Sequence, residues 1–152
     1  AAFGRVKHAL RIGAVLFRES LAGALPPGSH GSTFGGNSLA TAVGAAVLGI
    51  VRDEAFLAAV RARGERLGAG LAEVAKKHPK LCERERGLGL LRAIALRDDA
   101  PPSRDVVAAA REHGLLITAA SATAIRFTPP LVVTDAEIDE AVGLVDTTLG
   151  AL

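Results

Sequence analysis

The sequence contains no tyrosine or tryptophan, and five phenylalanines are its only large aromatic side chains. Proteins that bind single-stranded nucleic acid stack the bases on aromatic side chains, and this chain lacks such a set. Its formal net charge is only +2, because 18 basic residues are nearly balanced by 16 acidic ones. The alternating acidic and basic residues at positions 83–86 show this balance locally. Nucleic acid is therefore not an expected partner.

Cysteine and long hydrophobic runs are also scarce. Cys82 is the only cysteine, which excludes a disulfide within the chain and is typical of a reducing, cytoplasmic setting. We expect Cys82 to be a small buried hydrophobic residue rather than a nucleophile. No apolar run approaches the roughly 18 residues of a membrane span, so a membrane is not an expected partner either.

Histidines and acidic residues do not fall at the spacings of a metal site or a catalytic triad. His30 has no second histidine, cysteine or carboxylate at metal-ligand spacing around it. His78 and His113 fall near the expected C-terminal ends of helices, where a partly positive ring is favoured. We therefore predict no metal site.

The hydrophobic content of 49% is enough for one well-packed domain of 152 residues. Apolar residues recur at three- and four-residue spacing over residues 39–51, 57–74 and 138–149, which predicts three helices. Thr134 and Glu137 have the spacing of a capping box at the start of the last helix. Ser103 is placed to cap a further helix that Gly114 ends.

Short apolar runs between these helices predict strands. We expect them at residues 12–17, 81–84, 88–96, 115–118 and 124–127, with bends at 86–89 and 119–123. Residues 19–25 are expected to form a short helix. Together these elements predict an α+β fold, in which helices pack on a small, largely antiparallel sheet like an α/β sandwich.

A glycine-rich loop at residues 27–37 has the strongest chemical signal in the chain. It contains four glycines, three hydroxyl residues, a histidine and an asparagine directly before a predicted helix. Such a loop can bind an anion with hydroxyls and backbone N–H groups, or it can simply cap the helix through Asn37 or Ser38. It nearly fits a nucleotide-binding P-loop, but Asn37 stands where the P-loop lysine is expected.

Arg126 is the second candidate site residue. In a strand, Ile125 and Phe127 share one face and Arg126 lies on the other. An arginine in that place is most often solvated, and its functional use would be bidentate recognition of a carboxylate.

An ordered series of motifs resembles one known family. The motifs are residues 12–16 (IGAVL), 27–37 (PGSHGSTFGGN), 86–90 (RGLGL), 114–116 (GLL) and 125–131 (IRFTPPL). Over about residues 12–152 the chain is similar to the C-terminal portion of class III, fold-type I pyridoxal-phosphate aminotransferases, and most of all to the acetylornithine and ornithine group. The resemblance implies the C-terminal domain fold of those enzymes.

The resemblance also implies functions for particular residues. It implies that Ser32 and Thr33 reach the phosphate of pyridoxal 5'-phosphate in the other subunit, and hence a homo-oligomer, specifically a homodimer. It implies that Arg126 binds the α-carboxylate of the amino-acid substrate. The implied reaction moves an amino group from N-acetylornithine or ornithine to 2-oxoglutarate, in arginine biosynthesis.

The chain also departs from the family pattern. The family's Schiff-base lysine is expected just before residue 12, where Lys7 is the nearest lysine and the following residues are not the family's glycines. The aspartate that holds the pyridine nitrogen has no counterpart, and Ser38 replaces a proline. We therefore expect the isolated chain to be inactive.

The resemblance divides the chain into three parts. Residues 1–37 correspond to a remnant of the large cofactor-binding domain with the phosphate loop, 38–70 to long linking helices, and 71–152 to the small C-terminal domain. A chain of this kind is expected to be a truncated enzyme or a subunit completed by another chain. Two other functions remain open: a non-catalytic interaction module and a stand-alone phosphate-binding domain.

Overall fold

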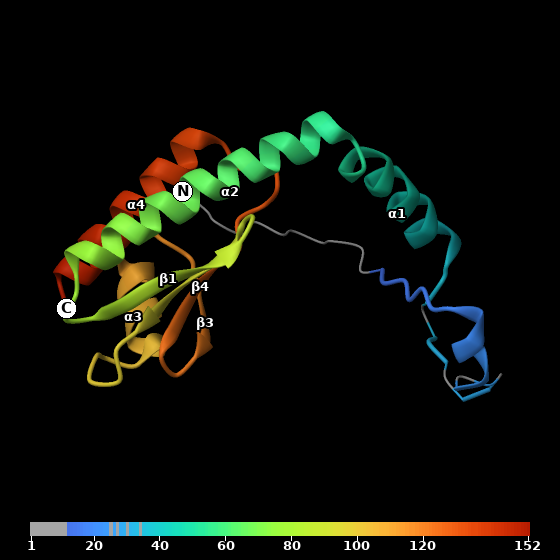
Figure 1. Cartoon of the computed structure of the whole chain (residues 1–152), viewed down its shortest axis with the longest axis horizontal. Helices are drawn as coiled ribbons and strands as arrows, with labels where there is room; N and C mark the ends of the chain where they lie inside the picture. The colour runs from blue at the N-terminus through green and yellow to red at the C-terminus, as the bar shows by residue number, and fades with distance from the viewer. Residues whose placement is uncertain (1–11, 25, 27, 30, 34) are drawn as a thin grey trace. The chain divides into compact units, whose positions relative to one another are not determined.

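The computed structural model describes residues 12–24, 26, 28, 29, 31–33 and 35–152. Contacts divide these residues into two compact units, with the division in the chain between Asp53 and Glu54. Figure 1 shows the elements along the chain. The three-part division expected from the sequence places one boundary at the start of the first long helix and the other inside the second.

The unit that ends at Asp53 contains a short 3-10 helix, η1 (Glu19–Ala24), and one α-helix, α1 (Ser38–Val51). The short helix predicted at residues 19–25 is present over Glu19–Ala24, and residue 25 lies outside the described residues. The buried strand predicted at residues 12–17 is wrong: these residues form no strand, and Leu16 is 97% exposed. Apolar composition alone does not make a strand, because its backbone groups need a paired neighbour.

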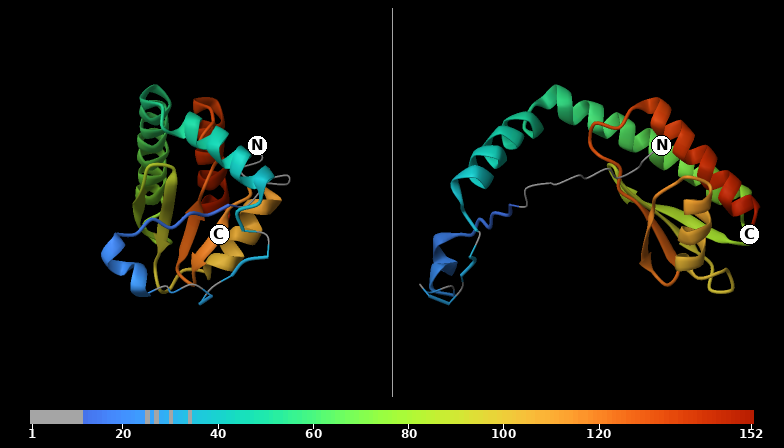
Figure 2. Two further views of the ribbon diagram at one scale, coloured as in Figure 1. Left: turned by 90° about the vertical axis from the view of Figure 1, so that its right-hand side faces the viewer. Right: turned by 180° about the vertical axis from the view of Figure 1, so that it is seen from behind.

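The unit that begins at Glu54 has two layers. It contains α2 (Glu54–Lys77), β1 (Cys82–Leu88), β2 (Leu91–Leu96), α3 (Ser103–Glu112), β3 (Thr118–Ser121), β4 (Ala124–Phe127) and α4 (Asp135–Gly150). The four strands form one antiparallel sheet in the order β1-β2-β4-β3. Figure 2 shows α2 and α4 side by side along one layer, in agreement with their contacts. The α+β fold expected from the sequence is confirmed.

The core lies between the sheet and the three helices of this unit. Leu67 and Leu71 of α2 are fully buried, as are Ile94 of β2 and Ile125 of β4. Val106, Ala110, Ile138, Val145 and Leu149 complete this core from α3 and α4. The periodic apolar positions of the sequence therefore mark the buried helix faces. The capping box is confirmed as well, with both of its hydrogen bonds present.

The strand boundaries differ from the sequence-based ones. β1 runs to Leu88, so the bend falls at residues 89–90 rather than 86–89. β1 continues through Gly87, whose φ of 151° favours glycine and where a Cβ atom would collide with the carbonyl oxygen of Leu91. β3 spans Thr118–Ser121, so the strand expected at residues 115–118 is displaced toward the C-terminus and the bend expected at 119–123 shortens to residues 122–123. Pairing with β4 sets these bounds, because Thr118 lies opposite Arg126 and Ser121 opposite Ala124.

Ser103 has a different role from the predicted one. The N-cap of α3 is Pro102, and Ser103 is the first residue inside the helix. The Ser103 hydroxyl donates a hydrogen bond to the carbonyl oxygen of Ser121 at 2.5 Å. Because this side chain is only 2% exposed, it needs a partner, and the end of β3 supplies one.

Candidate functional site

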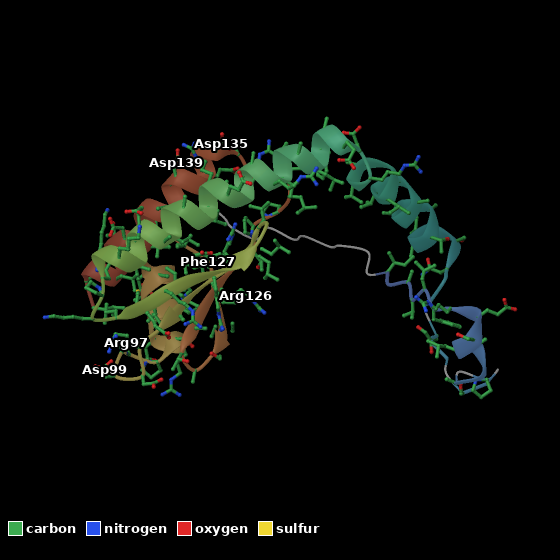
Figure 3. All side chains as sticks on the ribbon, viewed as in Figure 1. Arg97, Asp99, Arg126, Phe127, Asp135 and Asp139 are labelled. Atoms are coloured by element: carbon green, nitrogen blue, oxygen red, sulfur yellow. The ribbon has the colours of Figure 1, made fainter. Side chains whose placement is uncertain are left out.

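Arg126 lies in β4 on the face of the sheet turned away from the three helices. Ile125 and Phe127 beside it are buried in the core, whereas Arg126 is exposed. Figure 3 labels Arg126 and Phe127, which are consecutive in the strand and point to opposite faces. We call the face that carries Arg126 the open face.

The side chain of Arg126 is held by a hydrogen bond to the neighbouring strand. Its Nε donates to Oγ1 of Thr118 at 3.2 Å. Thr118 is also its direct partner in the register of β3 and β4, so the two side chains share the open face. This bond uses one guanidinium N–H and leaves the terminal Nη groups, which suit bidentate recognition of a carboxylate. Within the part of the chain that the structure describes, no carboxylate forms an ion pair with Arg126.

Behind the sheet, on its helix side, a partly buried arginine joins the β1–β2 hairpin to α2. Arg92 forms an ion pair with Glu85 at 3.2 Å, and both side chains are 14% exposed. The Arg92 Nε also donates to the carbonyl oxygen of Gly89 at 2.8 Å, and its Nη2 donates to that of Gly64 at 2.9 Å. These contacts position β2, the strand next to β4, relative to α2.

The glycine-rich loop belongs to the other unit. Ser32 and Thr33 are exposed and lie outside any helix or strand. Asn37 Oδ1 accepts a hydrogen bond from the backbone N–H of Ala40 at 2.9 Å, so Asn37 is the N-cap of α1. The capping function considered for the loop is thus present at Asn37, and the hydroxyls of Ser32 and Thr33 take no part in it. His30 lies outside the described residues.

Cys82 is a buried structural residue, as its isolation in the sequence predicted. Its side chain is 3% exposed, and burial raises the pKa of the thiol to about 11. A thiol with such a pKa is almost fully protonated at neutral pH and is a poor nucleophile.

The two described histidines make local contacts near the ends of helices. His78 follows α2, and its Nε2 lies 2.7 Å from Oδ1 of Asp146. His113 is the C-cap of α3, and its Nδ1 lies 3.0 Å from Oγ1 of Thr148. Among the residues with described positions, no group of His, Cys, Asp and Glu is arranged to hold a metal ion. No helix over those residues is long and apolar enough to cross a membrane.

The predicted site residues that the structure describes belong to two different units. Arg126 is brought together with Thr118, which sequence reasoning did not identify because β3 was expected to begin earlier. Ser32 and Thr33 are adjacent loop residues in the unit that ends at Asp53. Lys7 lies outside the described residues. The sequence analysis did not predict the ion pair between Arg92 and Glu85. The signal for it was an arginine within the apolar residues of β2, because a charged side chain in such a strand needs a partner.

Comparison with known proteins identifies the family. Residues 7–149 match the sequence profile described as aminotransferase class-III. The acetylornithine aminotransferase of Synechocystis sp. is 44% identical over 127 residues, which are 83% of this chain and 30% of that protein. The acetylornithine aminotransferase of Thermosynechococcus vestitus is 42% identical over 142 residues, or 93% of this chain and 34% of that protein.

Solved structures agree with the sequence comparisons. Acetylornithine aminotransferase from Elizabethkingia anophelis matches with a TM-score of 0.73 at 34% identity, over 86% of this chain and 33% of that one. Ornithine delta-aminotransferase from Plasmodium falciparum matches with a TM-score of 0.75 at 31% identity, over 88% of this chain and 34% of that one. The chain thus spans about a third of the length of the curated relatives that it matches. On these matches and this fold, the chain belongs to the class III aminotransferase family, among the acetylornithine and ornithine aminotransferases.

Proposed function

We propose that this chain provides the C-terminal part of a pyridoxal-phosphate-dependent aminotransferase that acts on N-acetylornithine or ornithine with 2-oxoglutarate. The observation that carries the proposal is Arg126, exposed on the open face and held by Thr118 with its terminal nitrogens directed to no carboxylate of the described chain. The named relatives support the substrate class. In that function the protein would serve arginine biosynthesis in the cytoplasm.

Arg126 would bind the α-carboxylate of the amino acid. A guanidinium offers two parallel N–H donors that match the two oxygens of a carboxylate. Because Thr118 holds the Nε side, the terminal Nη1 and Nη2 groups are the donors that remain for the substrate. Arg126 would thereby orient the amino group that is transferred.

Ser32 and Thr33 would hold the cofactor phosphate. The two exposed hydroxyls lie among the glycines of residues 28–36, where Gly28 and Gly36 have positive φ values of 85° and 67°. Hydroxyl donors on a loop with little side-chain bulk fit a phosphate ester. When bound, pyridoxal phosphate supplies an electron sink for amino-group transfer. The resemblance further supports a homodimer, in which these hydroxyls would serve the cofactor of the other subunit.

We also propose that the 152-residue chain alone is inactive, because amino-group transfer needs a lysine and an aspartate that this sequence does not place in the family's positions. The test is an assay for glutamate from N-acetylornithine and 2-oxoglutarate with added pyridoxal phosphate. The expected rate is that of buffer. A parallel borohydride reduction, followed by peptide mapping, is expected to give no stoichiometric pyridoxyl adduct on Lys7. Steady turnover or a specific Lys7 adduct would contradict the proposal.

The proposed catalytic function is tested in a chimera. Residues 12–152 replace the matching part of the Synechocystis relative, and transamination is measured in the parent chimera and in an Arg126→Gln variant. We expect an active parent and a loss of about 100-fold in kcat/KM for the variant, since two charged hydrogen bonds to the substrate are removed. Arg84→Gln is the matched control, because Arg84 is an exposed strand arginine already paired with Glu83 at 2.8 Å. Equal activity of the Arg126 variant and its parent would refute the function of Arg126.

A further inference from the structure

The residue that holds Arg126 belongs to a strand at the edge of the sheet. β3 is the last strand in the order β1-β2-β4-β3, and within the described part of the chain it pairs with β4 alone. An edge strand has hydrogen-bonded neighbours on one side only, so it opens more readily than a central strand unless further contacts hold it. Thr118 can orient Arg126 only if β3 itself is fixed.

Helix α3 fixes the far end of β3. The Ser103 hydroxyl donates a hydrogen bond to the carbonyl oxygen of Ser121 at 2.5 Å, and the Ser103 backbone N–H donates to that of Ala122 at 2.9 Å. Ser103 is buried, so water does not compete for these bonds. β3 is therefore attached to the helix layer at one end and to β4 along its length, which gives Thr118 a fixed backbone.

The contact between Thr118 and Arg126 determines which side of the guanidinium is available. Threonine is branched at Cβ, which restricts χ1 and with it the place of the hydroxyl oxygen. Arg126 Nε donates to this oxygen at 3.2 Å. A free arginine can offer a carboxylate either Nε with one terminal nitrogen or the two terminal nitrogens together. Because Thr118 occupies Nε, only the second arrangement remains.

We propose that Thr118 is a positioning residue, which orders Arg126 so that a substrate carboxylate meets the guanidinium at Nη1 and Nη2. The proposal rests on the proposed function, in which Arg126 binds the α-carboxylate. Arginine has a large rotamer entropy, and a side chain that is ordered before the ligand arrives loses less of it on binding. Thr118 thus strengthens binding of the substrate and of the transition state alike, so its loss raises KM and leaves kcat unchanged.

The order of the Arg126 side chain is measured by nuclear magnetic resonance relaxation of its Nε–Hε group in the complete 152-residue chain. Arg126→Gln assigns the signal by removing it. The order parameter should fall in Thr118→Val, which keeps the shape but lacks the hydroxyl, and should be retained in Thr118→Ser. Ser121→Ala is the matched control, because Ser121 is an exposed hydroxyl residue of β3 whose Oγ accepts from the N–H of Thr123 instead. Equal order in the unaltered chain and in Thr118→Val would overturn the proposal.

The effect on substrate binding is measured in the chimera with the Synechocystis relative. Thr118→Val should raise KM for N-acetylornithine about 3- to 10-fold, as for the ordering of one long side chain, and should keep kcat within about twofold. Thr118→Ser should restore KM, and Ser121→Ala should change neither constant. In the Arg126→Gln background, Thr118→Val should have no further effect, because no guanidinium is left to position. An equal effect in that background would show a general structural role and would overturn the positioning role.

The outcomes separate this proposal from the one on which it rests. If Arg126→Gln is as active as the parent chimera, the carboxylate function of Arg126 is overturned, and the role of Thr118 in substrate binding is overturned with it. If Arg126→Gln loses activity while Thr118→Val keeps the KM of the parent, only the role of Thr118 is overturned. The relaxation measurement needs no activity, so it decides whether Thr118 orders Arg126 in either case.

Discussion

At the residue scale, the open face depends on an arginine that lies on the other side of the sheet. Arg92 connects three separate parts of the chain: Glu85 of β1, the bend at Gly89 and Gly64 of α2. Gly68 makes room for this guanidinium, because a Cβ atom there would lie 2.7 Å from Arg92 Cζ. The geometry of β2, the strand next to Arg126, therefore depends on a partly buried polar contact.

Replacing Arg92 with alanine should lower the free energy of unfolding by about 2 kcal/mol, because the partly buried carboxylate of Glu85 and the carbonyl groups of Gly64 and Gly89 lose hydrogen bonds from a charged donor. Arg97→Ala is the control, since Arg97 is half-exposed and its ion pair with Asp99 is long at 3.4 Å. That change should cost less than about 1 kcal/mol. Urea unfolding followed by circular dichroism measures both, and equal losses would contradict the structural role of Arg92.

Cys82 should react with iodoacetamide only when the unit unfolds. The raised pKa of the thiol keeps the thiolate fraction low at pH 8, and the 3% exposure of the side chain keeps the reagent away from the sulfur atom. Mass spectrometry over time should show little adduct in buffer and rapid labelling in denaturing urea. Rapid labelling of the folded chain would indicate that the contact between α2 and β1 opens easily.

At the scale of elements, glycine decides how closely α2 approaches the sheet. A Cβ atom at Gly64 would lie 2.6 Å from the backbone of Gly89, which is nearer than a carbon atom can come without a shift. The helix therefore needs a residue without a side chain where it crosses the β1–β2 bend. Helix periodicity in the sequence does not reveal this requirement, because the glycine lies within an otherwise ordinary helical pattern.

Gly64→Ala should lower the free energy of unfolding by about 1–3 kcal/mol through overpacking. Gly143→Ala in α4 is the matched control, because a Cβ atom there has no neighbour within 4 Å. That substitution should be stabilising by up to about 1 kcal/mol, since alanine has the higher helix propensity. A stabilising effect of Gly64→Ala in the same urea series would refute the close approach.

The ends of α2 and α4 are joined by a charge contact that should depend on pH. Asp146 of α4 accepts hydrogen bonds from Lys77 and His78, each at 2.7 Å, and these bonds lower the pKa of its carboxyl group. A carboxyl group with a lowered pKa stabilises the fold above its ordinary pKa, and this contribution is lost as the pH falls through the folded-state value.

The urea midpoint of the unaltered chain should therefore fall more steeply than that of Asp146→Asn between about pH 5 and about pH 2, the range over which an aspartate with a lowered pKa becomes protonated. The asparagine variant has no proton to gain at this position. Parallel pH profiles for the two proteins would show that Asp146 makes no such contribution.

At the scale of the whole molecule, α1 has more apolar surface than an isolated helix usually exposes. It contains no charged residue, and Ala40 is its only buried residue among those described. Leu39, Val47, Leu48 and Ile50 are each at least 50% exposed. A helix that is apolar on all sides is normally covered by other structure, so this surface is consistent with the proposed assembly into a larger enzyme.

Sedimentation of the chain should therefore show concentration-dependent self-association at micromolar protein. Leu48→Glu should shift the distribution toward the monomer, because burial of a carboxylate in an apolar contact is costly. Leu88→Glu is the control, since Leu88 is also exposed, at 86%, but lies in β1. Association that is unchanged by Leu48→Glu would place the contact away from α1.

Local signals predicted the helices better than the strands. The apolar spacing from Leu67 to Val74 and the Thr134–Glu137 capping box depend only on residues within a few positions of one another, and both are confirmed. The strand predicted at residues 12–17 had the right composition but has no pairing in the structure. The β1–β2 bend was displaced because Gly87 is held in a strand by its pairing with Arg92.

The sequence by itself determined the α+β class, the family and the candidate residues Ser32, Thr33 and Arg126, because these depend on periodicity and on motifs that are contiguous in the chain. Only the tertiary structure decided that Thr118 holds Arg126, and that Arg92 pairs with Glu85 and contacts Gly64 of α2. Those relations join residues of different elements. Their register is set by long-range pairing and by packing on α2, which local composition does not encode.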